Sequence, residues 1–137
     1  MLPPIRIVLA DDHDLMRTTI EEVLQQNNHL EVVASCNNGN DAVEKTLLLQ
    51  PHFLLIDVVM QPINGLQVAE KVKTSLPNTK IIAFSSHSNP GYARAFLELG
   101  ANGFLVKGSI GTELLAAIEA VNNGNTYLCS EIKALMQ

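Results

Sequence analysis

Short apolar runs alternate with longer segments in which apolar residues recur at helical spacing, and this alternation limits the folds that the chain can adopt. The short runs, rich in β-branched residues, lie at residues 5–10, 30–36, 53–57, 80–85 and 103–107. Apolar strands separated by amphipathic helices are typical of a parallel sheet that carries helices on both faces. The pattern therefore predicts an α/β domain.

The number of strand–helix units favours an open sheet. Five units are too few for an eightfold barrel, which needs about 250 residues, but they suit a doubly wound, flavodoxin-like (βα)5 sheet with strand order 2-1-3-4-5. Pro90 suits the first turn of the fourth helix, and Gly100 suits its C-terminal cap. A chain of 137 residues has room for one such domain. We expect this domain to span residues 1–124, with residues 125–137 as a tail or the start of an interdomain linker.

Composition narrows the class of function. The net charge of −5 opposes direct nucleic-acid binding by this segment, because neutralising phosphates requires a basic face. Cys36 and Cys129 are too few for a disulfide framework or a soft-metal site. No segment resembles a signal peptide or approaches the roughly twenty apolar residues of a membrane span. We therefore expect a cytoplasmic protein without membrane contacts.

Charged and hydroxyl residues stand at the carboxyl ends of four predicted strands. Asp11 and Asp12 follow the first strand, and Asp57, Ser85 and Lys107 end the third, fourth and fifth. In open α/β sheets, ligands bind outside these strand ends, where the winding reverses. Carboxylates crowded together repel one another unless a cation is bound, and Mg²⁺ accepts carboxylates while it keeps waters and binds phosphate oxygens. The sequence predicts a magnesium site at this edge.

The same residues suit phosphoryl transfer. An aspartate beside the metal can act as a nucleophile and form an aspartyl phosphate, while Lys107 and Ser85 stabilise the charge of the transferring group. Taken singly, each of these residues is better explained by a structural role, as a helix cap, a turn former or a solvated charge. Their joint occurrence at matching strand ends favours the chemical interpretation.

The motifs at these strand ends resemble those of the receiver domains of two-component response regulators, a family of phosphorelay signalling proteins. The resemblance rests on Val8–His13, Leu55–Met60, Gly65, Ser85 and Gly103–Lys107, and it extends from residue 5 to about residue 124. It implies that a sensor histidine kinase or a phosphotransfer protein phosphorylates the chain. Beyond self-phosphorylation and slow self-dephosphorylation, no enzymatic activity is implied.

The resemblance also implies roles for single residues of the metal and phosphoryl site. Asp57 would be the phosphoacceptor and a metal ligand. Asp12 would bind Mg²⁺ directly, Asp11 largely through water, and Val59 through its backbone carbonyl. Ser85 would donate a hydrogen bond to the phosphoryl group, and Lys107 would pair with it.

Four positions resemble those that control signalling in the family. Ser85 and Phe104 would form a switch in which the ring rotates inward after phosphorylation, although Phe104 is equally explained as a permanently buried core residue. Val59 and His87 would set the lifetime of the phosphoryl group by controlling the attacking water. His13, His29 and His52 are interpreted as histidines without a metal, because no further soft donors accompany them.

Finer detail resembles the NarL/FixJ type of response regulator. The features are His13 with Arg17 after the aspartates, Ser85 in place of threonine, the absence of proline after Lys107, and the run Glu113–Ile118. This type usually controls transcription through a C-terminal DNA-binding domain, which is not present in this chain. The apolar fourth helix, with the fifth, would form a homodimer surface or dock a partner; deep burial of the fourth helix is the rival interpretation. A stand-alone receiver and a pseudo-receiver that is never phosphorylated remain alternatives.

One loop departs from the family pattern. The family usually places proline four residues after the phosphoacceptor, whereas this chain has Gln61 there and Pro62 next. We expect an altered backbone in this loop. Magnesium affinity is the property most exposed to that change, because Val59 would bind the metal from the same loop.

Two other functions are disfavoured. Metal-dependent phosphatases with an aspartate nucleophile typically carry Asp-x-Asp after one strand, whereas Asp11 and Asp12 are adjacent and the candidate nucleophile lies on another strand. A flavin-binding flavodoxin-like protein needs a hydroxyl- and glycine-rich phosphate loop after its first strand. The acidic residues at this position would repel a phosphate.

Overall fold

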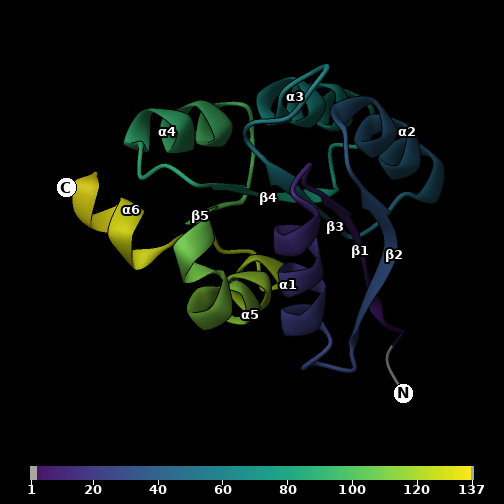
Figure 1. Ribbon diagram of the computed structural model, residues 1–137, viewed down its shortest axis with the longest axis horizontal. Coiled ribbons are helices and arrows are strands. Elements are labelled where there is room, and N and C mark those ends of the chain that lie inside the picture. Colours follow the sequence, from purple (N-terminus) through teal and green to yellow (C-terminus); the bar gives the residue numbers. More distant parts are fainter. Residues whose placement is uncertain (1–2, 137) are drawn as a thin grey trace.

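A parallel sheet of six strands, in the order β2-β1-β3-β4-β5-β6, runs through the protein in a computed structural model that describes residues 3–136 (Figure 1). The strands are β1 (Ile5–Ala10), β2 (Leu30–Cys36), β3 (Phe53–Asp57), β4 (Lys80–Ser85), β5 (Gly103–Val106) and β6 (Tyr127–Leu128). The predicted order 2-1-3-4-5 is confirmed. The short strand β6 was not predicted, and it extends the sheet beside β5.

Helices cover both faces of the sheet. They are α1 (Asp14–Leu24), α2 (Gly39–Leu49), α3 (Gly65–Ser75), α4 (Pro90–Glu98), α5 (Ile110–Asn122) and α6 (Ser130–Leu135), with a 3-10 turn η1 (Lys107–Ser109) before α5. Helices α1 and α5 pack together on one face, and α2, α3 and α4 lie on the other (Figure 1). No helix within residues 3–136 combines the length and apolar character needed to cross a membrane.

The core consists mainly of aliphatic side chains from the central strands and the inner stripes of the helices. All five residues of β3 are buried, as a strand covered on both faces requires. The helices contribute the buried residues Ile20, Val23, Leu24, Val68, Ala69, Val72, Leu114, Ala117, Ile118 and Val121. Because this core fixes the register of each strand, it also fixes where the strand-end side chains point.

Local signals place the helix ends. Helix α3 begins with a capping box, in which Asn64 and Gln67 each accept a hydrogen bond from the other's backbone N–H. Pro90 starts α4, and Gly100 follows this helix with a φ of 103°, in the left-handed region that favours glycine. Ser109 occupies the N-cap position of α5 without a side-chain capping bond, because its hydroxyl donates to the backbone oxygen of Val106 (2.8 Å).

Gly65 brings α3 close to the end of β3. A Cβ at this position would overlap the backbone carbonyl of Asp57, and the Gly65 N–H donates to the Val58 oxygen (2.9 Å). A side chain would therefore push the helix away from the strand end. The contact holds the loop that follows Asp57 close to β3.

Residues 127–135 add β6 and α6 at one edge of the sheet. The N–H groups of Tyr127 and Cys129 donate to the backbone oxygens of Asn102 and Phe104, both at 3.0 Å. Cys129 and Ile132 are fully buried, and α6 contacts α4 and β5. The segment for which the sequence predicts a tail or the start of a linker thus packs onto the domain over these residues.

Candidate functional site

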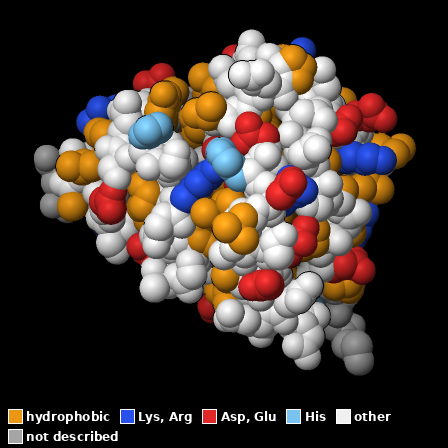
Figure 2. All heavy atoms as spheres, in the orientation of Figure 1, with side chains coloured by type: hydrophobic (Ala, Val, Ile, Leu, Met, Phe, Trp, Pro, Cys, Tyr) orange, Lys and Arg blue, Asp and Glu red, His pale blue; other side chains and the backbone are white. Residues whose placement is uncertain are grey.

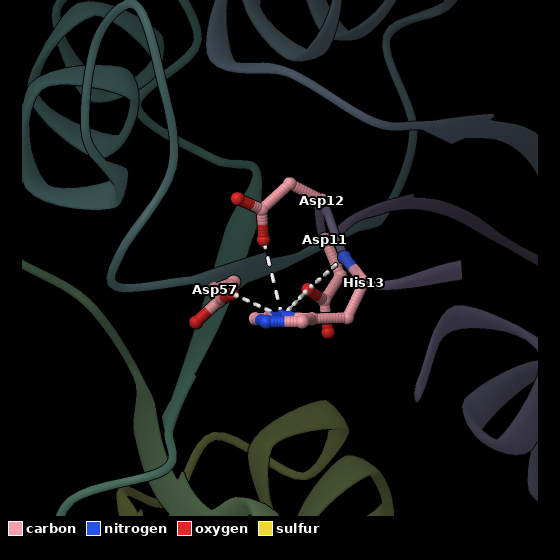
Figure 3. A group of neighbouring side chains, drawn as sticks. All are labelled: Asp11, Asp12, His13 and Asp57. Atoms are coloured by element: carbon pink, nitrogen blue, oxygen red, sulfur yellow. Dashed lines mark hydrogen bonds and ion pairs between the residues drawn. The ribbon is translucent and has the colours of Figure 1, made fainter. Parts of the chain in front are cut away.

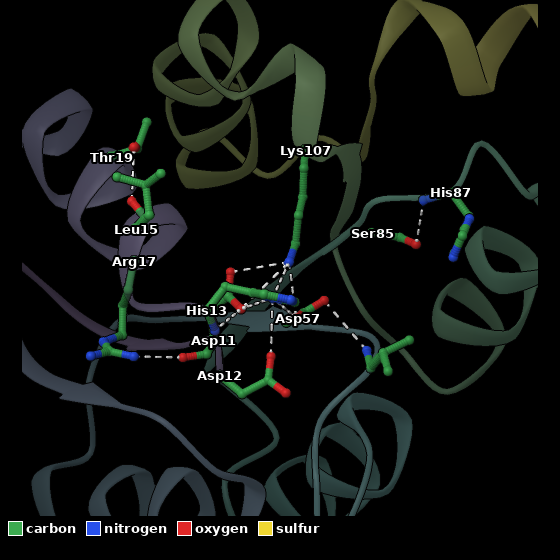
Figure 4. A network of polar contacts seen from close by, with 11 residues as sticks. Asp11, Asp12, His13, Leu15, Arg17, Thr19, Asp57, Ser85, His87 and Lys107 are labelled. Carbon is green, nitrogen blue, oxygen red and sulfur yellow. Dashed lines mark hydrogen bonds and ion pairs between the residues drawn. The ribbon is translucent and has the colours of Figure 1, made fainter.

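The strand-end residues converge at one rim of the sheet (Figure 4). Asp11 directly follows β1, Asp57 is the last residue of β3, and Lys107 directly follows β5. Their strands are brought together by the order β1-β3-β4-β5. Acidic, basic and histidine side chains gather on this face of the molecule, next to an apolar patch (Figure 2).

Three carboxylates lie close together at this rim. Asp11 is fully buried and Asp57 is 2% exposed, whereas the side chain of Asp12 is 39% exposed. One ligand atom from each, together with one from His13, lies within 4.8 Å of the others. Asp11 Oδ2 has no hydrogen-bond partner among residues 3–136, although it is buried. An oxygen-rich cluster in which one buried oxygen accepts no hydrogen bond fits a hard divalent cation such as Mg²⁺.

Lys107 supplies the positive charge nearest to these carboxylates. Its Nζ lies 3.1 Å from Asp57 Oδ2 and 3.3 Å from Asp11 Oδ2, and its side chain is only 10% exposed. The ammonium also lies 5.9 Å from the centre of the Phe84 ring. Because one ammonium faces three carboxylates, negative charge remains in excess at the rim.

Burial and the neighbouring negative charge both affect the ionisation of Asp57. Burial is the main cause that raises the pKa of Asp57 to about 6, and its hydrogen bonding with Asp11 and the charge of Asp11 act in the same direction. The charge of Lys107 and its hydrogen bond oppose the rise. A cation bound beside Asp57 would favour the carboxylate form.

Ser85 and His87 lie on the β4 side of the rim. Ser85 is buried at the end of β4, and its Oγ accepts a hydrogen bond from the His87 N–H at 3.0 Å (Figure 4). The hydroxyl is thus engaged by the loop that leads to α4. A role of Ser85 at a phosphoryl group remains a prediction.

The loop after β3 carries Val59 and the altered proline. Val59 is 53% exposed, and its N–H donates to Asp57 Oδ1 at 3.4 Å. The peptide bond between Gln61 and Pro62 is cis, and the Gln61 oxygen accepts a hydrogen bond from the Gly39 N–H (3.3 Å). The expected sensitivity of magnesium affinity to this loop stays a prediction.

Phe104 is fully buried in this structure. Its ring centre lies 6.0 Å from that of Phe96 on α4, with the ring planes inclined by 53°. Phe96 and Ala93 bury the inner side of α4, while Tyr92 is exposed. A buried ring agrees with a core role and also with the inward position of a switch.

His13 has a place in the cluster that the sequence reasoning did not give it. Its Nδ1 lies 3.2 Å from Asp11 Oδ1 and 3.1 Å from Asp12 Oδ1 (Figure 3). Because no further histidine or cysteine accompanies His13 in the sequence, no metal role was predicted for it. The signal that could have identified it is its position directly after two acidic residues at a strand end.

Arg17 and local hydrogen bonds hold the turn between β1 and α1. The Arg17 guanidinium donates to the Asp11 backbone oxygen (2.9 Å) and pairs with Asp14 (2.9 Å). A hollow of about 360 Å³ opens beside this turn. It is lined by His13, Leu15, Met16, Thr19, Ser86 and Lys107.

Comparison with known proteins gives one family match over most of the chain. Residues 7–119 match the family described as the response regulator receiver domain. The oxygen regulatory protein NreC of Staphylococcus aureus (strain JH9) is 36% identical over 124 residues, which cover 90% of this chain and 57% of that protein. The transcriptional regulatory protein LnrK of Bacillus subtilis (strain 168) is 31% identical, over 96% of this chain and 60% of LnrK. The chain therefore spans less than two thirds of these relatives.

A solved structure of a response regulator receiver domain also resembles this chain. The signal receiver domain of the response regulator NarL from Mycobacterium tuberculosis aligns with a TM-score of 0.84 and 32% identity. The alignment covers 90% of this chain and 100% of that one. The similarity therefore extends over a complete domain.

Proposed function

The chain belongs to the response regulator receiver domain family, and we propose on this basis that Asp57 accepts a phosphoryl group from a histidine kinase or a phosphotransfer protein. The observation that carries the proposal is the setting of Asp57. This carboxylate is buried at a strand end, beside the carboxylates of Asp11 and Asp12, with the Lys107 ammonium 3.1 Å away. A nucleophile, a cation-binding cluster and a fixed positive charge are the parts that phosphoryl transfer needs.

In the proposed reaction, an oxygen of Asp57 attacks the phosphorus of a phosphohistidine. The new O–P bond forms as the N–P bond breaks, and the electron pair of that bond returns to the donor imidazole. Lys107 is positioned to stabilise negative charge on the transferring oxygens, and its burial makes that interaction stronger than in water. Ser85 would donate its hydroxyl hydrogen to a phosphoryl oxygen; its Oγ only accepts from the His87 N–H, so that contact does not use the O–H donor.

Asp11, Asp12 and Asp57, with the backbone carbonyl of Val59, are the proposed ligands of Mg²⁺. The acidic donor set supports this assignment, together with the buried Asp11 Oδ2, which accepts no hydrogen bond among residues 3–136 although Lys107 Nζ lies 3.3 Å from it. When bound, the ion supplies positive charge that neutralises the carboxylates and the phosphoryl oxygens. We further propose that Val59 and His87 set the rate of hydrolysis of the aspartyl phosphate, since Val59 is exposed next to the acceptor.

Phosphorylation would act on an output surface made of α4, β5 and α5. Phe104 on β5 contacts Phe96 on α4, so that a movement of either ring would be transmitted between the two elements. We propose homodimerisation through α4 and α5. Transcriptional control through a DNA-binding domain outside this chain is also proposed, since LnrK is named a transcriptional regulatory protein and the chain covers 60% of it.

Intact-protein mass spectrometry tests the phosphoacceptor. The chain is incubated with acetyl phosphate and Mg²⁺, in parallel with an Asp57→Asn variant and with a chelated sample. We expect one phosphoryl adduct on the wild-type chain, and none on the variant or after chelation. Absence of an adduct from the wild-type sample would favour a pseudo-receiver instead.

A further inference from the structure

Arg17 reaches back from α1 to the turn that carries the acidic residues (Figure 4). One terminal nitrogen of its guanidinium, Nη1, donates to the backbone oxygen of Asp11 (2.9 Å), and the other, Nη2, pairs with Asp14 Oδ1 (2.9 Å). The side chain of Arg17 is 20% exposed and that of Asp14 is 85% exposed, whereas Asp11 is fully buried. The bond to Asp11 is therefore the more sheltered of the two contacts.

This bond restrains the peptide unit between two proposed metal ligands. The Asp11 carbonyl belongs to the planar unit that joins Asp11 to Asp12. On the other side of the same residue, the Asp11 N–H donates to the Cys36 oxygen at the end of β2 (3.1 Å). Both backbone polar groups of Asp11 are thus bound, one by the sheet and one by Arg17. The direction in which the chain leaves β1 toward Asp12 depends on both bonds.

The rest of the turn is tied to the same two residues. The His13 N–H donates to Asp11 Oδ1 (2.9 Å), and the Arg17 N–H donates to the His13 oxygen (3.0 Å). The Asp12 side chain between them is 39% exposed. Packing therefore restrains Asp12 only in part, and its position depends on how firmly the backbone of the turn is held.

A group that holds metal ligands in place affects the affinity for the metal without touching it. Removing such a group typically costs about 10- to 100-fold in affinity. We propose that Arg17 is a positioning residue of the cation site, which holds Asp11 and Asp12 in the arrangement that binds Mg²⁺ through its bond to the Asp11 carbonyl. The proposal rests on the proposed function, because it concerns the same magnesium ligands.

The charge of Arg17, taken alone, predicts the opposite effect on the affinity for Mg²⁺. A positive charge close to a cation site repels the ion, so that removal of the charge would strengthen binding. Loss of positioning would weaken binding instead. The direction of the change therefore distinguishes a positioning role from a purely electrostatic one.

Magnesium titration followed by amide NMR tests the proposal without a phosphoryl donor. We expect Arg17→Met, which keeps an unbranched apolar stem but removes the charge and the donors, to weaken Mg²⁺ binding about tenfold. Arg17→Lys keeps the charge but not the forked donors, and it should weaken binding less than Arg17→Met but still measurably. Asp14→Asn is the matched control, because it removes the ion pair of Arg17 and leaves the bond to Asp11. It should change the affinity less than about threefold, as expected for an exposed ion pair.

The same spectra report the fold and the turn in metal-free protein. Dispersed amide signals in Arg17→Met would show that its weaker binding is not caused by unfolding, and we expect exchange broadening of its Asp12 and His13 amides that is absent from Asp14→Asn. If Arg17→Met does not fold, Arg17→Lys decides: weaker binding than in the wild type supports the proposal, and unchanged binding overturns it.

Three other results would overturn the proposal. They are unchanged or tighter Mg²⁺ binding in folded Arg17→Met, equal weakening in Asp14→Asn, and sharp Asp12 and His13 amides in metal-free Arg17→Met. In each case Mg²⁺ still binds the wild type, so that only the role of Arg17 is wrong. A wild-type spectrum that does not respond to Mg²⁺ would overturn the magnesium assignment together with the role of Arg17.

Discussion

Asp57 combines burial with three charged neighbours, and these give it a chemistry that its residue type alone does not supply. The sequence predicted Asp11, Asp12, Asp57 and Lys107 at one rim, because a parallel sheet brings its carboxyl strand ends together. The pKa of Asp57 could not be predicted in this way. It depends on how completely the side chain is buried and how closely Asp11 approaches it.

The raised pKa of Asp57 predicts a pH-dependent stability in metal-free protein. The folded-state pKa of about 6 lies above the ordinary value of 3.8, so the protonated group stabilises the fold fully below about pH 4. This contribution is lost as the pH rises through 6. Above pH 7, we expect Asp57→Asn to be more stable than the wild type by roughly 2–3 kcal/mol.

Urea unfolding in the presence of a chelator, from pH 4 to pH 8, measures the effect. The difference in free energy of unfolding between Asp57→Asn and the wild type should grow between pH 4 and pH 6 and then level off. A difference that is constant with pH would show that the pKa of Asp57 is not raised in the folded chain.

At the scale of elements, β6 and α6 are the strand and the helix that the sequence did not predict. Strand β6 has only two residues, too few for a periodic pattern, and α6 is a helix of six residues. Their placement depends on tertiary contacts, in which Cys129 and Ile132 are buried. Such contacts join residues distant in sequence, so they leave no local signal.

Glu113 on α5 fixes these two elements to the domain. Its carboxylate accepts hydrogen bonds from the Tyr127 hydroxyl (2.7 Å), the Ser130 N–H (3.1 Å) and the Ser130 hydroxyl (3.3 Å). Burial, the hydrogen bond to Glu113 and its charge raise the pKa of Tyr127 to about 12. Tyr127 therefore remains a hydrogen-bond donor throughout the physiological range.

Replacing Glu113 should loosen the C-terminal segment. We expect Glu113→Ala to lower the free energy of unfolding by about 1–2 kcal/mol, because it removes three hydrogen bonds to a charged acceptor that is partly open to solvent. Amide exchange followed by mass spectrometry should become faster in residues 127–135. The matched control is Glu119→Ala, an exposed position on the same helix. Equal exchange in the two variants would refute the role of Glu113.

At the scale of the whole molecule, the strand order followed from the alternation of strands and helices and from the rules that govern doubly wound sheets. The fold and the site are also coupled energetically. The same sheet that buries the core brings the carboxylates of Asp11, Asp12 and Asp57 together, and the Lys107 ammonium pairs with Asp11 and Asp57. Their mutual repulsion opposes folding when no cation is bound.

Bound Mg²⁺ should therefore stabilise the entire domain. A ligand at 100 times its dissociation constant adds about 2.7 kcal/mol to the free energy of unfolding, and we expect a rise in the unfolding temperature when Mg²⁺ is added. The rise should be larger at pH 8 than at pH 5, because protons compete with the ion for carboxylates, above all at Asp57 with its pKa of about 6.

Asp12→Asn separates binding at the site from a general salt effect. The Asp12 side chain is partly exposed, so the substitution should leave the fold intact while it removes the charge of one proposed ligand. Differential scanning calorimetry should then show a much smaller Mg²⁺-dependent rise for the variant than for the wild type. An equal rise would mean that Mg²⁺ stabilises the chain by binding at another site, and not by binding to the carboxylates of the acidic rim.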